Sequence, residues 1–502
     1  MTSLKPTIAS ILWNSIGKVL EYVLLYAMSI LVARGLGLYQ NGTYATLMSL
    51  TQVLLVLSSM GLETALNKHI PQIDEPHAGG GTRYLLIRAI FLRVIIFVLG
   101  AAVLRYGLEI FLKSPAAELR DYLLVLFAYA ASRALIPLFA IVLTARYRTD
   151  IVAAVNVGAR LVEIGAVLFM AQEGLTIQGL LLLFSVTGLG QIACYVLIAR
   201  HVFLGSTSPQ PVRPFVTFGA IFWVNAIVDY FLGRHGDIFF LTSITGDPTA
   251  ASLYDVAYSV VQLASLALTV GFGGVTFATF ASLAVSSPEG MDRFYEFLVR
   301  LISCLTIPLY AFLVFHSDSL VKGFYSTAFA GAAALVQGIA WFRITARLFG
   351  GGENTEYLLA RGFPGRVSTF GVFAAIINIT LDLSLIPIFG AGGAVIASGV
   401  ANVFVNSAGY FLVRRRSPIH LQVVTWAKVT GVSLLLSWGL SILMPVQDLV
   451  HVPITGGVLV GGVVVALFIL KPFTATDVEM LQAFSPFAAS SVRLFARRAH
   501  GG

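Results

Sequence analysis

Basic side chains deep within apolar segments are the residues of this sequence best suited to bind a charged ligand. Arg343 and Arg347 stand one helical turn apart in the apolar stretch 332–360, just before a glycine triplet at 350–352. An arginine at the bilayer centre costs roughly 2.5 to 3.5 kcal/mol on insertion scales, so two on one helix indicate a side that lines a polar space. The triplet predicts a hinge in the same stretch.

Two further arginines, Arg93 and Arg133, lie at similar depth, and none of the four has an acidic residue within the same helical turn. Either another helix or the ligand must supply the counter-charge. A guanidinium stays charged and binds two oxygens of a phosphate at once, so a phosphate-bearing anion is a ligand that fits. Basic residues with an acid three positions later on the same helical face are instead expected to be neutralised locally; these are Lys18 with Glu21, Arg160 with Glu163, and Arg234 with Asp237.

Carboxylates within the apolar segments are candidates for ion coupling. Asp229, Glu353 and Asp382 have no obvious basic partner in the same turn. A carboxylate in a low-dielectric site can take up and release a proton or hold a sodium ion during a transport cycle. Pairing across helices is the competing explanation for Asp229, and Glu353 is also placed near the inner water layer.

The composition defines the class of protein. The chain has 502 residues, 57% of them hydrophobic and only 11% charged, and its mean hydropathy is +0.87. Soluble domains carry about a quarter charged residues, so we expect an all-α polytopic membrane protein. The net charge of +8 comes from short loops between spans, which excludes a nucleic-acid-binding face. Neither a cofactor nor a metal site is expected, and Cys194 and Cys304 fall in apolar spans, against a disulfide framework.

The apolar runs predict about 14 transmembrane helices. They fall near residues 8–33, 42–66, 84–104, 121–143, 151–171, 178–199, 215–240, 251–281, 294–315, 332–360, 364–388, 392–413, 422–444 and 453–470. With the N-terminus inside, inner segments hold 17 lysines and arginines and outer segments hold 5. We therefore expect a multi-pass protein of the inner (cytoplasmic) membrane with both termini in the cytoplasm. Arg300, near an inner boundary, is expected to reach the headgroups.

Internal repeats predict two lobes. Three short patterns recur in order: Tyr44 with Tyr254 at an offset of 210 residues, then Arg146 with Arg361 and Tyr195 with Tyr410 at 215. Near-constant offsets favour two six-helix halves in parallel orientation around a cavity. The predicted parts are an N-terminal lobe 1–200, a proline-containing linker 201–214, a C-terminal lobe 215–416, two additional helices in 417–470 and a cytoplasmic tail 471–502. In the tail, Phe473 is expected either in the membrane interface or in a solvated segment.

Several glycine- and turn-based motifs resemble one known family. They are Ala33 to Gly37 followed by Gly42 to Tyr44, Gly61 to Leu66, Asp237 to Tyr254, and Asn378 with Leu385 to Pro387 and Gly393-Ala394. Over roughly residues 8–470 the chain resembles the polysaccharide-export and O-antigen flippases. Their superfamily also holds lipid II flippases and multidrug exporters of the MATE type, so the resemblance implies a MATE-like fold.

The resemblance implies translocation of a polyprenyl-pyrophosphate-linked oligosaccharide by alternating access, coupled to a proton or sodium gradient. Expected partners are this glycolipid, membrane lipids, and a polysaccharide polymerase or glycosyltransferases. The residues expected to act are Arg93, Arg133, Arg234, Arg343, Arg347 and Asn378 on substrate, Asp229, Glu353 and Asp382 on the ion, and Gly350, Gly351, Gly352 and Pro137 as hinges.

Three alternatives remain open. A drug exporter of the same fold would favour an acid-lined cavity for cationic drugs, whereas the deep basic residues here are mostly arginines. A lipid II flippase is compatible with fourteen helices. A membrane-bound glycosyltransferase or polymerase is disfavoured because the sequence has no long extramembrane loop, aspartate-rich motif or histidine cluster.

Overall fold

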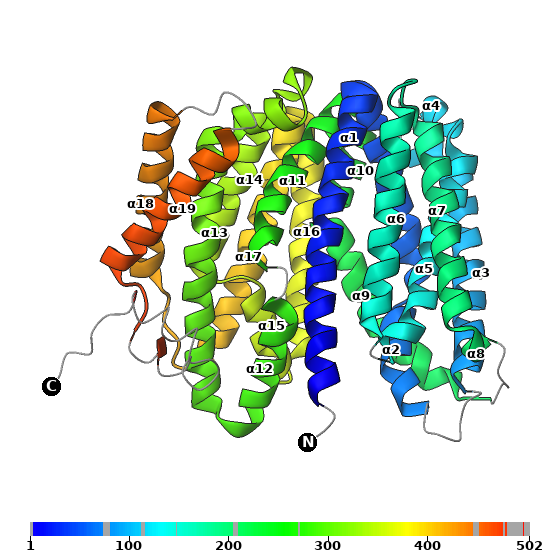
Figure 1. Cartoon of the computed structure of the whole chain (residues 1–502), viewed down its shortest axis with the longest axis horizontal. Helices are drawn as coiled ribbons and strands as arrows, with labels where there is room; N and C mark the ends of the chain where they lie inside the picture. The colour runs from blue at the N-terminus through cyan, green and yellow to red at the C-terminus, as the bar shows by residue number, and fades with distance from the viewer. Residues whose placement is uncertain are drawn as a thin grey trace. The chain divides into compact units, whose positions relative to one another are not determined.

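The computed structural model describes residues 4–73, 81–111, 116–146, 148–203, 209–269, 272–444, 451–474, 477–478 and 495. The elements within these ranges are all helical (Figure 1). They are α1 Leu4–Ser59, α2 Leu62–Ile73, α3 Gly81–Phe111, α4 Ala116–Arg120, α5 Leu123–Thr144, α6 Thr149–Met170, α7 Ile177–Ile198, α8 Arg200–Phe203, α9 Val212–Leu232, α10 Arg234–Thr245, α11 Pro248–Thr269, α12 Phe272–Ser286, α13 Pro288–Phe324, η1 Thr327–Phe329, α14 Ala332–Ala346, η2 Arg347–Phe349, α15 Gly352–Ala360, α16 Pro364–Phe389, α17 Ala391–Arg414, α18 Val423–Leu443 and α19 His451–Leu470.

The predicted membrane segments are confirmed as helices, in a polytopic all-α fold. Within the described residues, eleven helices are long and apolar enough to cross a membrane. Three of the fourteen predicted segments do not appear as separate spans among these eleven helices. The second segment largely continues α1, which turns at Gly37 (φ 74°), while 251–281 and 332–360 are each divided into two shorter helices. Glycine adopts this positive φ without a Cβ clash.

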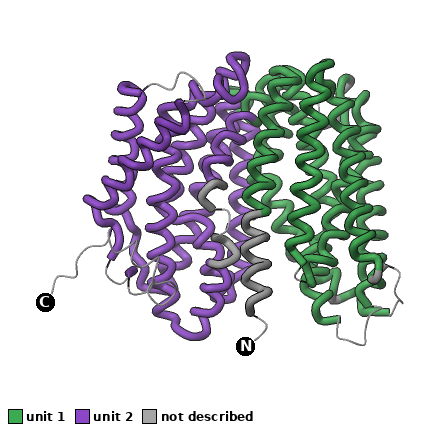
Figure 2. The backbone as a smooth tube through the Cα atoms, viewed as in Figure 1, with its two compact units in different colours: residues 1–255, 386–390 green, residues 256–385, 391–502 purple. Residues whose placement is uncertain are grey.

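The chain forms two compact units (Figure 2). Unit 1 comprises residues 1–255 and 386–390, and unit 2 comprises 256–385 and 391–502. The division falls within α11, so α9 and α10 belong to unit 1 although the repeats assign 215–254 to the second lobe. The lobe boundaries drawn from the repeats therefore stay a prediction.

Unit 1 packs its helices through aliphatic side chains. α1 lies against α6 and α3, and α5 lies against α7. The core contains Leu50 of α1, Leu126 of α5, Val167 of α6 and Leu180 of α7, all buried. Since these helices also expose many apolar side chains, the core and the lipid-facing surface are both hydrophobic, as a membrane bundle requires.

Unit 2 is built around α13, which packs against α14 and α18. Further along, α14 packs against α17, and α15 packs against α12 and α17. Gly399 of α17 lies directly over the Phe342 ring of α14, where any side chain would overlap the ring. This close approach fixes the helix that carries Arg343 and Arg347.

The start of the tail differs from prediction. Phe473 is buried in the core of unit 2 beside Phe297, in neither the membrane interface nor a solvated segment. Arg300 is likewise buried rather than extended to the headgroups, because Asp477 accepts a hydrogen bond from its guanidinium at 2.6 Å. The counter-charge of Arg300 is thus a carboxylate 177 residues later in the sequence, and not a lipid headgroup. Most of the predicted tail, and residues 204–208 of the linker, lie outside the described residues.

Candidate functional site

Unit 2 contains an open cavity of about 410 Å³ with both polar and apolar residues on its wall. It lies between α11, α13, the α14–α15 region and α17. The polar and charged residues on its wall are Tyr258, Gln262, Ser265, Thr306, Tyr310, Arg343, Arg347, Thr355, Asn402 and Asn406, together with the backbone of Gly350, Gly351 and Gly352. The two arginines and the three glycines of the predicted stretch therefore line one space.

The helix that lines this cavity is broken at the glycines. α14 ends at Ala346, η2 follows, and Gly350 has φ +88° and ψ −147° before α15 begins at Gly352. This backbone region is essentially restricted to glycine. Asn354 holds the break, since its Nδ2 donates to the carbonyls of Phe349 at 2.9 Å and Asn406 at 3.1 Å.

Arg347 is held by a bidentate ion pair across the break. Its Nη2 and Nη1 donate to Glu353 Oε1 at 2.9 Å and Oε2 at 3.2 Å. The side chains are only 10% and 4% exposed. Such a fork fixes the guanidinium in one orientation. Glu353, predicted as an ion-coupling residue, is thus the carboxylate partner of Arg347.

Arg343 is the second arginine on the cavity wall. It lies on the wall one turn before Arg347 and is half-buried. Among the described residues that form the wall there are two arginines and no carboxylate, and Glu353 behind the wall pairs with Arg347. An anion that enters this cavity therefore meets two guanidinium groups and no carboxylate on the described wall.

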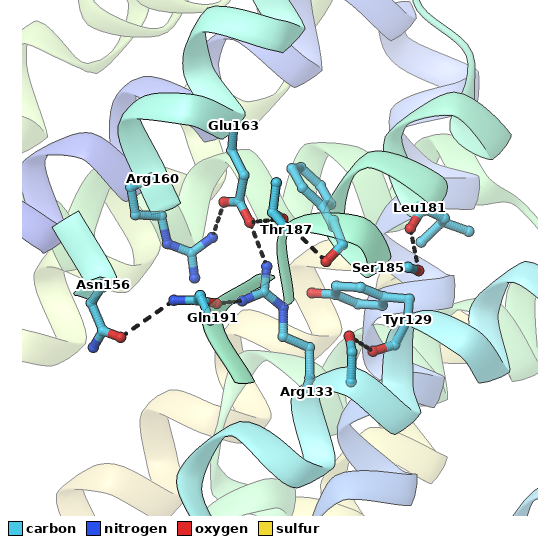
Figure 3. Close-up of polar contacts among 11 residues, drawn as sticks. Tyr129, Arg133, Asn156, Arg160, Glu163, Leu181, Ser185, Thr187 and Gln191 are labelled. Carbon is cyan, nitrogen blue, oxygen red and sulfur yellow. Dashed lines mark hydrogen bonds and ion pairs between the residues drawn. The ribbon is translucent and has the colours of Figure 1, made fainter. Parts of the chain in front are cut away.

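Unit 1 contains a second polar cluster, around Arg133 (Figure 3). Glu163 is fully buried on α6 and accepts from Arg133 at 2.7 Å and from Arg160 at 2.5 Å. Thr187 of α7 donates to the same carboxylate at 2.7 Å. The predicted pair of Arg160 with Glu163 is confirmed, and the acid for Arg133 comes from another helix.

The cluster extends along α6 and α7 through amides. Arg133 donates to Gln191 Oε1 at 3.3 Å, and Gln191 donates to Asn156 Oδ1 at 3.4 Å (Figure 3). Asn156 Oδ1 also accepts from the Tyr195 hydroxyl at 2.8 Å. Both oxygens of the Glu163 carboxylate accept hydrogen bonds, and the network links α5, α6 and α7 within the bundle.

The other two predicted substrate arginines also have carboxylate partners in unit 1. Arg93 is almost fully buried and pairs with Glu63 of α2. Arg234 pairs with Asp255 of α11 at 3.4 Å, while Asp237, its expected partner, accepts a hydrogen bond from Tyr254. Neither arginine is on the wall of the 410 Å³ cavity.

The remaining predicted residues occupy separate places. Asn378 and Asp382 are both fully buried on one face of α16, where Asn378 Nδ2 donates to Asp382 Oδ2 at 3.2 Å. Asp229 is exposed on α9. Pro137 lies inside α5, which continues through it to Thr144. The helix is thus broken at the glycine triplet, while hinge motion at the triplet and at Pro137 stays a prediction.

Comparison with known proteins decides the family. The profile of a family described as "Polysaccharide biosynthesis protein" matches residues 31–334, more than half of the chain. The chain belongs to this polysaccharide biosynthesis family. No curated protein matches it by sequence.

Solved structures with the same fold are transporters. The polysaccharide biosynthesis protein is similar to the lipid II flippase MurJ in an inward closed conformation, with 12% identity, 91% of this chain and 98% of that chain covered, and a TM-score of 0.74. It is similar to an inward-facing MATE multidrug resistance transporter of the MOP superfamily, with 16% identity, coverages of 79% and 94%, and a TM-score of 0.65. A MOP superfamily transporter from Pyrococcus furiosus matches with 15% identity, coverages of 82% and 96%, and a TM-score of 0.57. These likenesses show the MATE-like fold.

Sequence reasoning missed several polar residues of this polysaccharide biosynthesis protein. Asn402 and Asn406 line the cavity, and Gln191 joins the network of Arg133. The repeats offered a signal, because Arg133 and Arg347 are 214 residues apart, and Gln191 and Asn406 are 215 apart. The predicted repeat therefore pairs Arg133 with Arg347 and Gln191 with Asn406.

Proposed function

We propose that this polysaccharide biosynthesis protein moves a polyprenyl-pyrophosphate-linked oligosaccharide from the inner to the outer leaflet of the cytoplasmic membrane. The observation that carries the proposal is the cavity with Arg343 and Arg347 on its wall and no carboxylate among its described lining residues. A diphosphate brings at least two negative charges, and guanidinium groups bind its oxygens with good geometry.

Arg343 and Arg347 have different roles in this proposal. Glu353 orients Arg347 and balances its charge, so Arg347 presents a fixed edge to the ligand. Arg343 offers the diphosphate a second guanidinium on the same wall. Asn402, Asn406 and Gln262 on the same wall supply amides for the sugar nearest the phosphates.

The three arginines of unit 1 take a structural role. Arg93, Arg133 and Arg234 each have a carboxylate partner on a neighbouring helix. Removing one charge of a buried pair leaves the other uncompensated, so these residues maintain the packing of α2, α3, α5, α6, α10 and α11.

Two properties separate the alternative functions, namely the charge of the substrate and the identity of its sugars. A cationic drug would be repelled by the arginine-lined wall, which disfavours a drug exporter. Lipid II also presents a polyprenyl pyrophosphate and would meet the same arginines. The lipid II hypothesis is therefore distinguished by the sugar of the accumulated lipid.

Arg343→Ala tests the proposed cavity. We expect normal insertion and folding, with transport of lipid-linked oligosaccharide into vesicles reduced roughly ten- to hundredfold, because one charge-assisted phosphate contact is lost. The control is Arg414→Ala, which removes an exposed arginine at the end of α17 and leaves transport near that of the unchanged protein. Equal transport by both variants would remove the phosphate-binding role.

Deletion of the protein in its host gives the complementary measurement. A polyprenyl-linked glycan should accumulate on the inner leaflet, and mass spectrometry of extracted lipid identifies its sugars. A single disaccharide-pentapeptide lipid would identify the lipid II alternative, and no lipid-linked glycan at all would contradict the proposal.

Ion coupling is proposed at Asp382. Its carboxylate is fully buried beside Asn378, and together they offer oxygen ligands for sodium or a carboxylate for a proton. Asp382→Asn is expected to bind substrate yet lose the dependence of transport on an imposed gradient. Vesicles loaded with a proton or a sodium gradient show which ion drives the unchanged protein, and an unaltered gradient response in the variant argues against this site.

A further inference from the structure

The connection between α15 and α16 in unit 2 carries a half-buried aromatic ring, Phe363, that none of the preceding roles uses. Gly362 has φ +82°, and its N–H donates to the Leu359 carbonyl at 3.0 Å. The N–H of Phe363 donates to the Leu358 carbonyl at 2.9 Å. These two bonds form a Schellman motif, which ends α15. The Phe363 carbonyl in turn accepts from the N–H of Arg366 at 3.2 Å, so the backbone of this residue is fixed from both sides.

Two guanidinium groups lie over the Phe363 ring. That of Arg416, just after the end of α17, is 5.0 Å from the ring centre, and that of Arg366, in the first turn of α16, is 5.9 Å from it. The backbone beside Arg416 is held as well, because Ser417 is buried and its Oγ lies 2.6 Å from the Tyr357 hydroxyl. Cation–π contact with a fixed ring therefore places two positive charges beside each other.

The acid of this region is engaged elsewhere. Asp292 of α13 accepts a hydrogen bond from Arg361 at 3.2 Å. Within the described ranges, no carboxylate forms an ion pair with Arg366, Arg415 or Arg416, and all three side chains are exposed. Like charges held close together repel, so an anion bound between them is favoured.

The loop of unit 1 that corresponds by the repeat is built differently. An offset of 215 residues places Arg148 opposite Phe363 and Ile151 opposite Arg366. Arg148 pairs with Asp150 at 3.3 Å. That loop thus carries its own counter-charge, and the arrangement around Phe363 is more than the usual excess of basic residues in inner loops.

The ring lies where two membrane spans end. α16 begins at Pro364 and α17 ends at Arg414, and both helices are long and apolar enough to cross a membrane. Further along α16, Phe373 and Ile376 are exposed. The loop charges predict that this end of the spans is the inner one, where anionic lipid headgroups give the leaflet a negative surface. The N-terminus of α16 adds a partial positive charge at the same height.

We propose that Phe363, Arg366 and Arg416 form a binding site for the headgroup phosphate of an anionic phospholipid in the inner leaflet. A guanidinium that stacks on a ring keeps its N–H groups directed sideways, where they can donate to phosphate oxygens. The acyl chains then lie along the exposed apolar side chains of α16. The site belongs to unit 2 alone, and it depends on neither the cavity nor the transported substrate.

Titration with lipids of different charge tests the site. The full-length protein in a neutral detergent is mixed with phosphatidylglycerol or with zwitterionic phosphatidylethanolamine, and native mass spectrometry measures the bound fraction. We expect tighter binding of phosphatidylglycerol, because only its headgroup carries a net negative charge. Equal affinity for the two lipids would overturn the proposal.

Two double variants separate a defined site from general surface charge. Arg366→Ala with Arg416→Ala should weaken phosphatidylglycerol binding roughly ten- to thirtyfold, because two arginine contacts are lost. Arg293→Ala with Arg414→Ala removes two exposed arginines of unit 2 that lie outside the ring contacts, and it should change the affinity by less than about twofold. Equal weakening by both pairs would reject the site.

A third variant tests the ring itself. Phe363→Leu keeps every charge and removes the cation–π contacts, so binding should weaken severalfold. It also replaces the arginine pair as the test if that variant does not fold, and unchanged affinity in folded Phe363→Leu would contradict the proposed geometry.

Competition identifies the occupant. Inorganic pyrophosphate at the same concentration should leave phosphatidylglycerol bound, because it has no acyl chains. Displacement by pyrophosphate, or by polyprenyl diphosphate at a much lower concentration, would overturn the assignment to a resident phospholipid.

Discussion

Glu353 shows how a single residue allows arginine to remain within the membrane. It lies six residues after Arg347 in the sequence, too far for the same helical turn, yet the break between α14 and α15 brings the two side chains together. A carboxylate that appeared suited to ion coupling is thereby committed to a bidentate pair. Asp382 accepts a hydrogen bond from the Asn378 amide and is the carboxylate at which we propose ion coupling.

Glu353→Gln is expected to lower the free energy of unfolding by about 3–5 kcal/mol, because Arg347 would remain charged and buried without its partner. Thermal or denaturant unfolding in detergent measures the effect. Replacement of both residues by methionine should recover much of the stability but not transport. A stable Glu353→Gln protein would show that the pair does not support the cavity wall.

The broken helix is the element that forms the cavity. A continuous helix from Ala332 to Ala360 would direct Glu353 away from Arg347 and close the space beside α17. The break requires Gly350, whose φ of +88° and ψ of −147° are unfavourable for a residue with a Cβ. Asn354 then fixes the start of α15 through two backbone carbonyls.

Gly350→Ala is therefore expected to destabilise the protein by about 1–3 kcal/mol and to reduce transport. Gly352→Ala is the matched control, since a Cβ there meets no atom within 4 Å and its φ is not positive. Unfolding curves of the two variants give the comparison. Equal stability would mean that the strain at Gly350 is relieved by a local shift.

At the scale of the whole molecule, loop charges predict orientation. Inner segments carry 17 basic residues and outer segments 5 under the proposed topology. Because basic loops are retained in the cytoplasm, both termini should lie inside. With this orientation, the stretch that carries Arg343 and Arg347 begins at the outer side of the membrane and ends at the inner side.

Cysteine labelling tests this orientation. In a Cys194→Ser background, chosen because Cys194 is exposed and Cys304 is buried, Glu173→Cys should react with a membrane-impermeant maleimide in intact cells. Arg415→Cys should react only after the inner membrane is permeabilised. Both positions are exposed in the structure, so the reverse pattern of labelling would invert the topology.

The amino-acid sequence by itself determined the class of protein and the position of most of its helices. These properties follow from local hydropathy and helix length, which neighbouring residues alone specify. The stretch 332–362 was predicted to be a broken helix that lines a water-filled space. The prediction followed because arginines are costly in lipid and a glycine triplet interrupts the helix.

Only the tertiary structure decided which charges pair across helices and which line the cavity. Arg93 and Glu63, like Arg133 and Glu163, are 30 residues apart, and Arg300 and Asp477 are 177 apart. The spacing of residues along one helix cannot predict such pairs, because they depend on which helices pack together. Packing also left Arg343 and Arg347 on one cavity wall, because a cavity arises from the fit of several helices and not from any one of them.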